Sequence, residues 1–156
     1  MKLHSLLSED MILAPLQGRS REAVLEEMVG HLRGRKADGF GDDLLVKLLE
    51  REELGTTAIG RGIAIPHCKI AGLRTPVLVL GLSPEGVSFG SVDGEDAHAI
   101  FLLVSPLEHP NVNLGVLAAI AKLARQSRAL AAKLLRAPSA AAVLEVLRRE
   151  EDGGHA

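Results

Sequence analysis

The stretch GRGIAIPHCK, residues 60–69, decides how the middle of this chain folds. Its apolar run, residues 63–65, lies between a glycine and a proline, and a histidine follows the proline at once. A short apolar run between turn residues predicts a buried strand, here over residues 62–65. Pro66 has a fixed φ and disfavours a helical backbone in the residue before it. We therefore expect His67 to stand on a rigid support at the end of this strand.

The rest of the chain predicts strands and helices on both sides of this stretch. Apolar runs predict strands over residues 11–16, 77–82 and 99–104, with weaker signals near 69–70 and 87–92. Apolar residues at helical spacing predict helices over residues 21–33, 42–53, 111–123, 129–135 and 138–149. This order indicates an α/β fold, a mixed β-sheet sandwiched by helices. No repeat or linker interrupts it, so we expect one domain over residues 1–150 and a disordered tail over 151–156.

The composition bounds the functions that this chain can carry. Only 2% of the 156 residues are aromatic, so the core of the expected single domain must consist of Leu, Val, Ile and Ala. A net charge of -2 gives no basic field for nucleic acid or an anionic membrane, and the scarcity of aromatic rings argues against base stacking. The single cysteine, Cys68, excludes an internal disulfide and favours the cytoplasm.

Neither a signal peptide nor a membrane span is expected from the sequence. Acidic residues at positions 9 and 10 interrupt the N-terminal apolar residues too early for a signal peptide. No uninterrupted apolar run approaches the roughly 20 residues that a membrane span needs. We therefore expect a cytoplasmic protein that acts at a membrane only through a partner.

Two interpretations of His67 stay open on the residues alone. A neutral imidazole on a rigid support is a good nucleophile near neutral pH, because it needs little reorganisation before attack. A structural histidine bonded to a loop carbonyl is the other interpretation, and local chemistry favours it. Arg51 also has two interpretations: its guanidinium can bind phosphate oxygens at two points, or it can lie on a solvated helix face and pair with Glu50 or Glu53.

Other chemistries find little support in the sequence. His67 and Cys68 are adjacent, but no CxxC or HxxxH spacing accompanies them, so we expect no metal site. The G-x-S-x-G pattern of serine hydrolases and the glycine loops of nucleotide-binding proteins are also missing from the sequence, so no nucleotide cofactor is expected. Backbone N–H groups around residues 60–62 remain a possible cradle for phosphate.

A longer stretch around His67 resembles a known signature. REELGTTAIGRGIAIPHCK, residues 51–69, resembles the active-site signature of the phosphotransferase-system EIIA domains of the fructose/mannitol class, and most of all their nitrogen-regulatory, PtsN-type branch. The signature itself runs without a gap from Arg51 to His67. The resemblance continues through VSFGSVDG (87–94), AIFLLVSP (99–106) and NLGVLAAIAKLAR (113–125), and it covers nearly the whole chain.

The resemblance implies a phosphocarrier with the fructose/mannitol-type EIIA fold. His67 corresponds to the family's histidine, which accepts a phosphoryl group from an HPr-like protein and passes it to an EIIB domain or keeps it as a regulatory mark. Arg51 corresponds to the arginine beside that ring. Such transfer asks the protein mainly for positioning and charge stabilisation, and Thr57, Arg61 and Asn113 are expected to help bind the phosphate. Neither a metal nor a cofactor is implied.

The chain departs from the family pattern in three places. Asn113 stands where many members have a second histidine, and asparagine can donate a hydrogen bond but cannot titrate. His109, four residues earlier, is a candidate substitute for it. Arg61 replaces a common asparagine or acidic residue, and Cys68 replaces a frequent glycine. Two alternatives stay open: a fructose- or mannitol-specific EIIA subunit for sugar transport, and a regulatory binding module of the same fold that is never phosphorylated.

Overall fold

A computed structural model describes residues 2–35 and 43–153 of the chain. The strands are β1 (Ile12–Leu13), β2 (Ala58–Gly60), β3 (Ile63–Ala64), β4 (His67–Ile70), β5 (Val77–Val87) and β6 (Ala97–Pro106). The α-helices are α1 (Arg21–Arg35), α2 (Leu44–Glu53), α3 (Pro110–Gln126), α4 (Leu130–Arg136) and α5 (Ala140–Glu151). Two 3₁₀ turns, η1 (Leu3–Ser5) and η2 (Glu9–Met11), precede β1.

The strands form one mixed sheet around an antiparallel pair, β5 and β6. β1 adds to β5 in parallel, and β2 pairs antiparallel with β3. β3 and β4 both pair with β6 in parallel, one after the other along the same side of that strand. The interruption between them contains Pro66, which has no N–H for the ladder, although its carbonyl still accepts from the Leu103 N–H at 2.9 Å. His67 therefore begins a separate edge strand.

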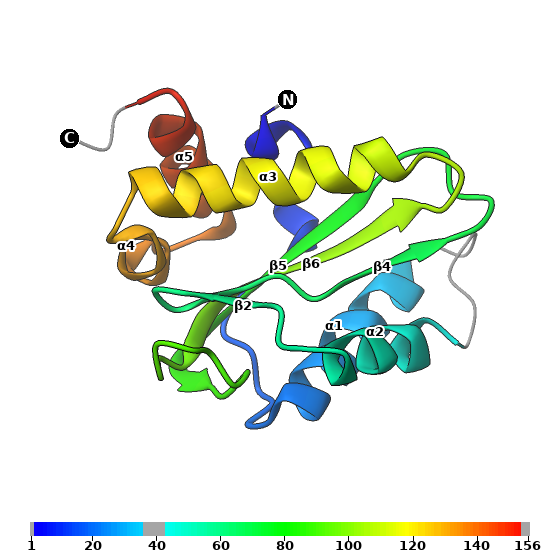
Figure 1. Cartoon of the computed structure of the whole chain (residues 1–156). Helices are drawn as coiled ribbons and strands as arrows, with labels where there is room; N and C mark the ends of the chain where they lie inside the picture. Colours follow the sequence, from blue (N-terminus) through cyan, green and yellow to red (C-terminus); the bar gives the residue numbers. More distant parts are fainter. Residues whose placement is uncertain (1, 36–42, 154–156) are drawn as a thin grey trace.

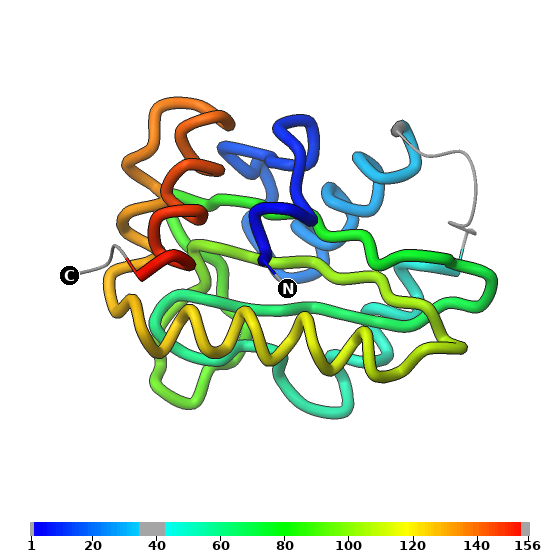
Figure 2. Tube along the Cα trace, turned by 90° about the horizontal axis from the view of Figure 1, so that it is seen from above, coloured from blue at the N-terminus to red at the C-terminus, as the bar shows by residue number. Residues whose placement is uncertain are grey.

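Helices cover both faces of the sheet (Figure 1). α3 crosses one face, whereas α1 and α2 lie against the other, and α4 and α5 gather near the C-terminal end of α3. Figure 2 shows from above that α3 runs along the edge made by β3 and β4. Because both faces are covered, all ten residues of β6 except His98 are buried. His67 thus lies at an edge between two helical layers.

The predicted fold class is confirmed, and so are most of the predicted elements. The strand at 11–16 is a two-residue strand at the sheet edge, and the signal near 69–70 belongs to β4. The separate strand expected over 87–92 is wrong, because Val87 ends β5 and residues 88–90 have no strand. β2 was not predicted, since its three residues, AIG, are too few to show a period in the sequence.

The two ends of the described chain meet. α5 runs to Glu151, two residues beyond the predicted end of that helix, and the Glu151 carboxylate accepts the His4 N–H at 2.9 Å. The end of the predicted tail, residues 154–156, lies outside the described residues, as does the predicted start of the helix at residue 42.

Candidate functional site

His67 is the first residue of β4 and lies opposite Leu103 of β6. Its ring is half-buried, and its Nδ1 lies 2.7 Å from the Ile65 carbonyl oxygen. A carbonyl oxygen can only accept, so the hydrogen of the neutral ring is on Nδ1 and the lone pair is on Nε2. The structure therefore shows the bond to a loop carbonyl that one of the two sequence interpretations expects, and that bond leaves the lone pair on the other ring nitrogen.

The surroundings of His67 favour the neutral ring. Burial lowers the pKa of His67 below its usual value of 6.5, the bond to the Ile65 carbonyl raises it, and the charge of Arg51 lowers it further. Burial dominates, so the pKa ends below 6.5. An unprotonated Nε2 is therefore the main form at neutral pH.

This lowered pKa predicts the pH dependence of any reaction in which Nε2 is the nucleophile. The neutral ring is the majority form at every pH above 6.5, and its fraction falls as the pH drops through the lowered pKa. We expect the initial rate of phosphoryl uptake to fall to half of its plateau only below pH 6.5. Stopped-time assays from mildly acidic to mildly basic pH, with phosphorylated donor in excess, measure this profile. A rate that has already fallen to half of its plateau at pH 7 would contradict a lowered pKa.

Arg51 lies in the last turn of α2, the helix that packs beside β4 (Figure 1). Its Nη1 donates to the Gly55 carbonyl at 3.0 Å, which holds the side chain over the turn after the helix. Its charge is close enough to lower the pKa of His67. The expected solvated pairing with Glu50 or Glu53 is not seen among the described residues. The structure thus places the Arg51 charge within electrostatic reach of His67.

Asn113 lies in the first turns of α3, on the face of the sheet to which the His67 side chain belongs. It is 4% exposed, and its Oδ1 accepts from the Ser105 hydroxyl at 3.0 Å. Ser105 lies two residues after Leu103, the register partner of His67, and residues two apart share one face of a strand. Within the described part of the chain no hydrogen bond occupies the Asn113 Nδ2. Asn113 thus lies on the face of the sheet to which His67 belongs, with its Oδ1 bonded to Ser105.

Thr57 lies near the site but its hydroxyl has another partner. Thr57 is buried and donates its hydroxyl to a carboxylate oxygen of Glu52, and its N–H donates to the second oxygen of that carboxylate at 3.2 Å. The sequence predicts Thr57 as a phosphate ligand, whereas in this structure its hydroxyl and its N–H both donate to Glu52. The sequence did not predict a role for Glu52, because its position next to Arg51 is the only feature of the sequence that connects it with the site.

The structure does not bring Arg61 to His67. Arg61 has a φ of 57°, and its Nη1 donates to the carbonyl oxygens of Ala124 at 3.0 Å and Arg125 at 3.4 Å. These carbonyls belong to the C-terminal end of α3, roughly 16 Å along the helix axis from Asn113 at 1.5 Å per residue. The prediction that Arg61 binds the phosphate therefore has no support in this geometry, and the guanidinium caps α3 instead.

Cys68 follows His67 but points to the other face of the sheet, because neighbouring strand residues alternate. Burial raises the pKa of its thiol to about 11, and the nearest charges are Lys47 and Asp43 at the start of α2. The thiol is therefore protonated at neutral pH and faces α2 rather than the His67 ring.

We expect Cys68 in the folded chain to react with iodoacetamide about a hundredfold more slowly than a thiol of ordinary pKa, because the thiolate is the reactive form. Mass spectrometry of timed samples gives the rate, and the chain unfolded in urea is the control, expected to react quickly. Equal rates for the folded and unfolded chain would contradict a buried thiol.

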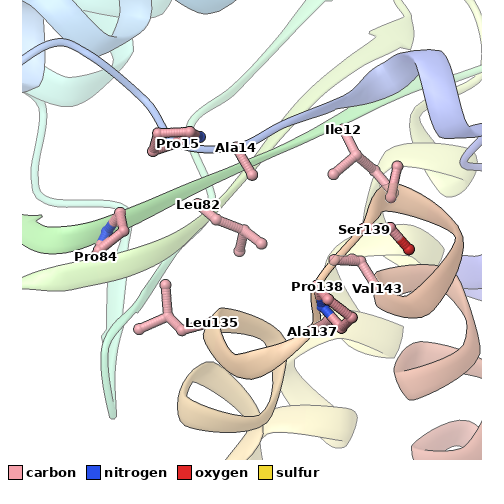
Figure 3. A pocket seen from close by; sticks show the side chains of 11 residues that line it. Ile12, Ala14, Pro15, Leu82, Pro84, Leu135, Ala137, Pro138, Ser139 and Val143 are labelled. Atoms are coloured by element: carbon pink, nitrogen blue, oxygen red, sulfur yellow. The ribbon is translucent and has the colours of Figure 1, made fainter.

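Three further features of residues 2–35 and 43–153 bear on the site. No group of three or more His, Cys, Asp or Glu side chains there could hold a metal ion. No helix among them is long and apolar enough to cross a membrane. A cavity of about 340 Å³ lies between β1 and the α4–α5 connection, lined by residues such as Leu82, Leu135 and Val143 (Figure 3). None of its lining residues is ionisable, and it does not include His67.

Comparison with known proteins agrees with this architecture. The sequence profile described as "Phosphoenolpyruvate-dependent sugar phosphotransferase system, EIIA 2" matches residues 5–150. The chain belongs to this family, the EIIA component of the phosphotransferase system. The resemblance inferred from the residues is thereby confirmed.

Two curated relatives show the range of the family. The chain is 29% identical to a nitrogen regulatory protein of Pseudomonas aeruginosa over 98% of its own length and 99% of that protein. It is 32% identical to the fructose-specific EIIABC component of Bacillus subtilis over 97% of its own length, but it spans only 24% of that protein. The relatives thus include both a nitrogen regulatory protein and a sugar-specific component.

Solved structures share the fold. The nitrogen regulatory protein IIA-Ntr of Neisseria meningitidis superposes with a TM-score of 0.79 at 28% identity, covering 93% of this chain and 98% of that one. Enzyme IIA of the mannitol system of Escherichia coli, solved as a complex with phosphorylated enzyme IIB, superposes with a TM-score of 0.72 at 21% identity, covering 91% of this chain and 96% of that one.

Proposed function

We propose that this chain is a phosphocarrier whose His67 takes a phosphoryl group from the phosphohistidine of an HPr-like protein. The Nε2 lone pair forms the new N–P bond, while the donor's N–P bond breaks and its electron pair returns to the donor ring. No proton has to move when the other nitrogen of the donor's phosphohistidine carries a hydrogen: the donor ring then leaves as neutral imidazole, and the His67 ring takes up the positive charge while its Nδ1–H stays hydrogen-bonded to the Ile65 carbonyl. The transfer then requires only alignment of the two rings and stabilisation of the charge on the moving group.

The observation that carries this proposal is the hydrogen bond between Nδ1 and the Ile65 carbonyl, 2.7 Å long, beside Arg51. It presents an unprotonated Nε2 next to a guanidinium that suits phosphate oxygens. The Asn113 Nδ2 supplies a further donor on the same side of the sheet, where a neutral amide takes the place of a second histidine. Thr57 contributes through Glu52 rather than by direct contact with the phosphate.

We propose that the phosphoryl group on His67 serves as a regulatory mark. The nitrogen regulatory relative, which matches over 99% of its length, and the TM-score of 0.79 to IIA-Ntr favour a protein whose phosphorylation state is read by a target protein. The second candidate is a sugar-specific EIIA that passes the group to an EIIB domain, and the 32% identity to the fructose-specific component favours it. The mannitol complex supports an EIIB partner for that candidate.

Donor-dependent labelling tests the common chemistry. The full chain is incubated with phosphoenolpyruvate, the phosphotransferase enzyme that uses it, and HPr, and its intact mass is followed. We expect a gain of one acid-labile phosphoryl group, which peptide mapping locates at His67. A chain that gains none from any HPr-like donor would overturn the phosphocarrier and favour the unphosphorylated binding module. Mixing the labelled chain with a fructose-type EIIB then separates the two destinations, since only the sugar-specific candidate loses its label rapidly.

A further inference from the structure

A buried carboxylate follows Arg51 in the chain and lies within electrostatic reach of His67. Glu52, in the last turn of α2, is only 3% exposed. Among the described residues it forms no ion pair, and its two oxygens accept from the N–H and the hydroxyl of Thr57. A buried carboxylate is costly unless such hydrogen bonds compensate it. The proposed transfer does not use Glu52 directly, so its place next to Arg51 calls for a separate explanation.

Hydrogen bonds connect Glu52 to the His67 ring in three successive steps. Glu52 holds Thr57, the Thr57 carbonyl accepts from the Ile65 N–H at 3.0 Å, and the Ile65 carbonyl accepts from the His67 Nδ1 at 2.7 Å. Of the four residues that these hydrogen bonds connect, Glu52, Thr57 and Ile65 are buried and only His67 is partly exposed. The bonds between them are therefore largely shielded from water.

Two hydrogen bonds flank the Ile65 carbonyl: the Ile65 N–H donates to the Thr57 carbonyl at 3.0 Å, and the Pro66 carbonyl accepts from the Leu103 N–H at 2.9 Å. The Ile65 carbonyl belongs to the peptide bond before Pro66, and proline has no N–H that could pair that peptide with β6. The Ile65 N–H, bonded to Thr57, therefore restrains this residue from the side of α2, and the Pro66 carbonyl restrains it from the side of β6. Thr57 is in turn bonded to Glu52 of α2, the helix that also carries Arg51. The Thr57 link thus connects the orientation of the ring with the helix that carries the guanidinium.

We propose that Glu52 is a positioning residue that acts through Thr57 and Ile65 to hold His67 with its hydrogen on Nδ1 and Nε2 outward. The consequence for phosphoryl transfer rests on the proposed function, but the effect on the ring exists in the unphosphorylated protein. The charge of Glu52 acts separately from its bonds. Together with Arg51 and Lys69, it is one of the charged groups that influence the pKa of His67, and it raises that pKa.

Two pairs of substitutions separate the bonds from the charge. Glu52→Ala removes both, whereas Glu52→Gln removes the charge but can keep two bonds to Thr57: its amide oxygen accepts from the Thr57 N–H, and its NH₂ group donates to the Thr57 hydroxyl oxygen. Thr57→Val removes the hydroxyl, and Thr57→Ser restores it. Glu53→Gln is the matched control, because it removes the same charge from the neighbouring, exposed position of α2.

Long-range ¹H–¹⁵N spectra of the ¹⁵N-labelled full chain measure the two tautomers of His67 without any phosphoryl donor. In Glu52→Ala and Thr57→Val we expect the ratio of the Nδ1–H to the Nε2–H tautomer to fall roughly five- to tenfold, the factor that an ordinary net hydrogen bond confers. Glu52→Gln, Thr57→Ser and Glu53→Gln should keep the wild-type ratio. In Glu52→Gln the pKa of His67 should also fall. Backbone spectra verify that each variant is folded.

The outcomes distinguish this inference from the proposed function. If Glu52→Ala and Thr57→Val are folded and retain the wild-type tautomer ratio, the positioning role is overturned. If Glu52→Ala does not fold, the Thr57→Val and Thr57→Ser pair decides the question in the same way. If the ratio changes as expected but the wild-type chain accepts no phosphoryl group, the phosphocarrier function fails and the role of Glu52 in orienting the ring stands.

Discussion

A chain with alanine in place of His67 is expected to take up no phosphoryl group under conditions that label the wild-type chain completely. The reason is geometric as well as chemical. Nε2 of His67 is the unprotonated atom beside Arg51, and its direction is fixed by the bond from Nδ1 to the Ile65 carbonyl. Removal of the ring deletes the acceptor itself, so partial activity is not expected. Intact mass after incubation with phosphoenolpyruvate and the donor proteins gives the measurement.

His98→Ala is the matched control for this experiment. His98 lies in β6 of the same sheet, is half-buried, and has its Nδ1 2.8 Å from the Ser83 carbonyl, so its ring is held in the same manner as that of His67. His98 lines a cavity with Arg61 and Arg128 that does not include His67. The His98 ring should therefore take up no phosphoryl group. The assignment would be refuted by an acid-labile phosphoryl group on the His67→Ala chain, or by loss of labelling in the His98→Ala chain alone.

Local sequence was enough to predict how His67 is supported. Pro66 and the glycines before it act within a few residues, and such short-range restraints survive in any tertiary context. The separate edge strand that starts at His67 follows from the same cause, because Pro66 interrupts the ladder with β6. The mixed sheet between helical layers likewise follows from the order of apolar runs, which the long buried strands β5 and β6 make unambiguous.

The sequence could not show which side chains gather around His67. The Arg61 guanidinium reaches carbonyls of Ala124 and Arg125 more than sixty positions later, and no local pattern specifies that contact. The Thr57 hydroxyl turns toward Glu52, although a threonine in a glycine-rich loop would serve equally well as a phosphate ligand. A charged residue such as Glu52 is normally exposed, so its burial depends on the packing of α2 and is invisible in sequence.

Replacement of Arg51 by alanine is expected to lower the rate of phosphoryl uptake by about a hundredfold to a thousandfold, the usual effect of removing one fixed donor to a transition-state oxygen. Arg51 lies in the last turn of α2, and its bond to the Gly55 carbonyl holds it in place before any phosphate arrives. Arg51→Lys should recover part of the loss, because it keeps the charge but not the planar two-point contact. Initial rates under saturating donor give the comparison.

Lys69→Ala is the control for the Arg51 experiment, since Lys69 is an exposed cation two residues from His67 that also lowers its pKa. A general effect of positive charge would make the two alanine variants similar, whereas a specific contact makes Arg51→Ala far slower. The pKa of His67 supplies a second measurement in the absence of any donor. Because Arg51 lowers that pKa, its removal should raise it, which an NMR titration of the ring detects. An unchanged pKa together with an unchanged rate would mean that the guanidinium does not act on this ring at all.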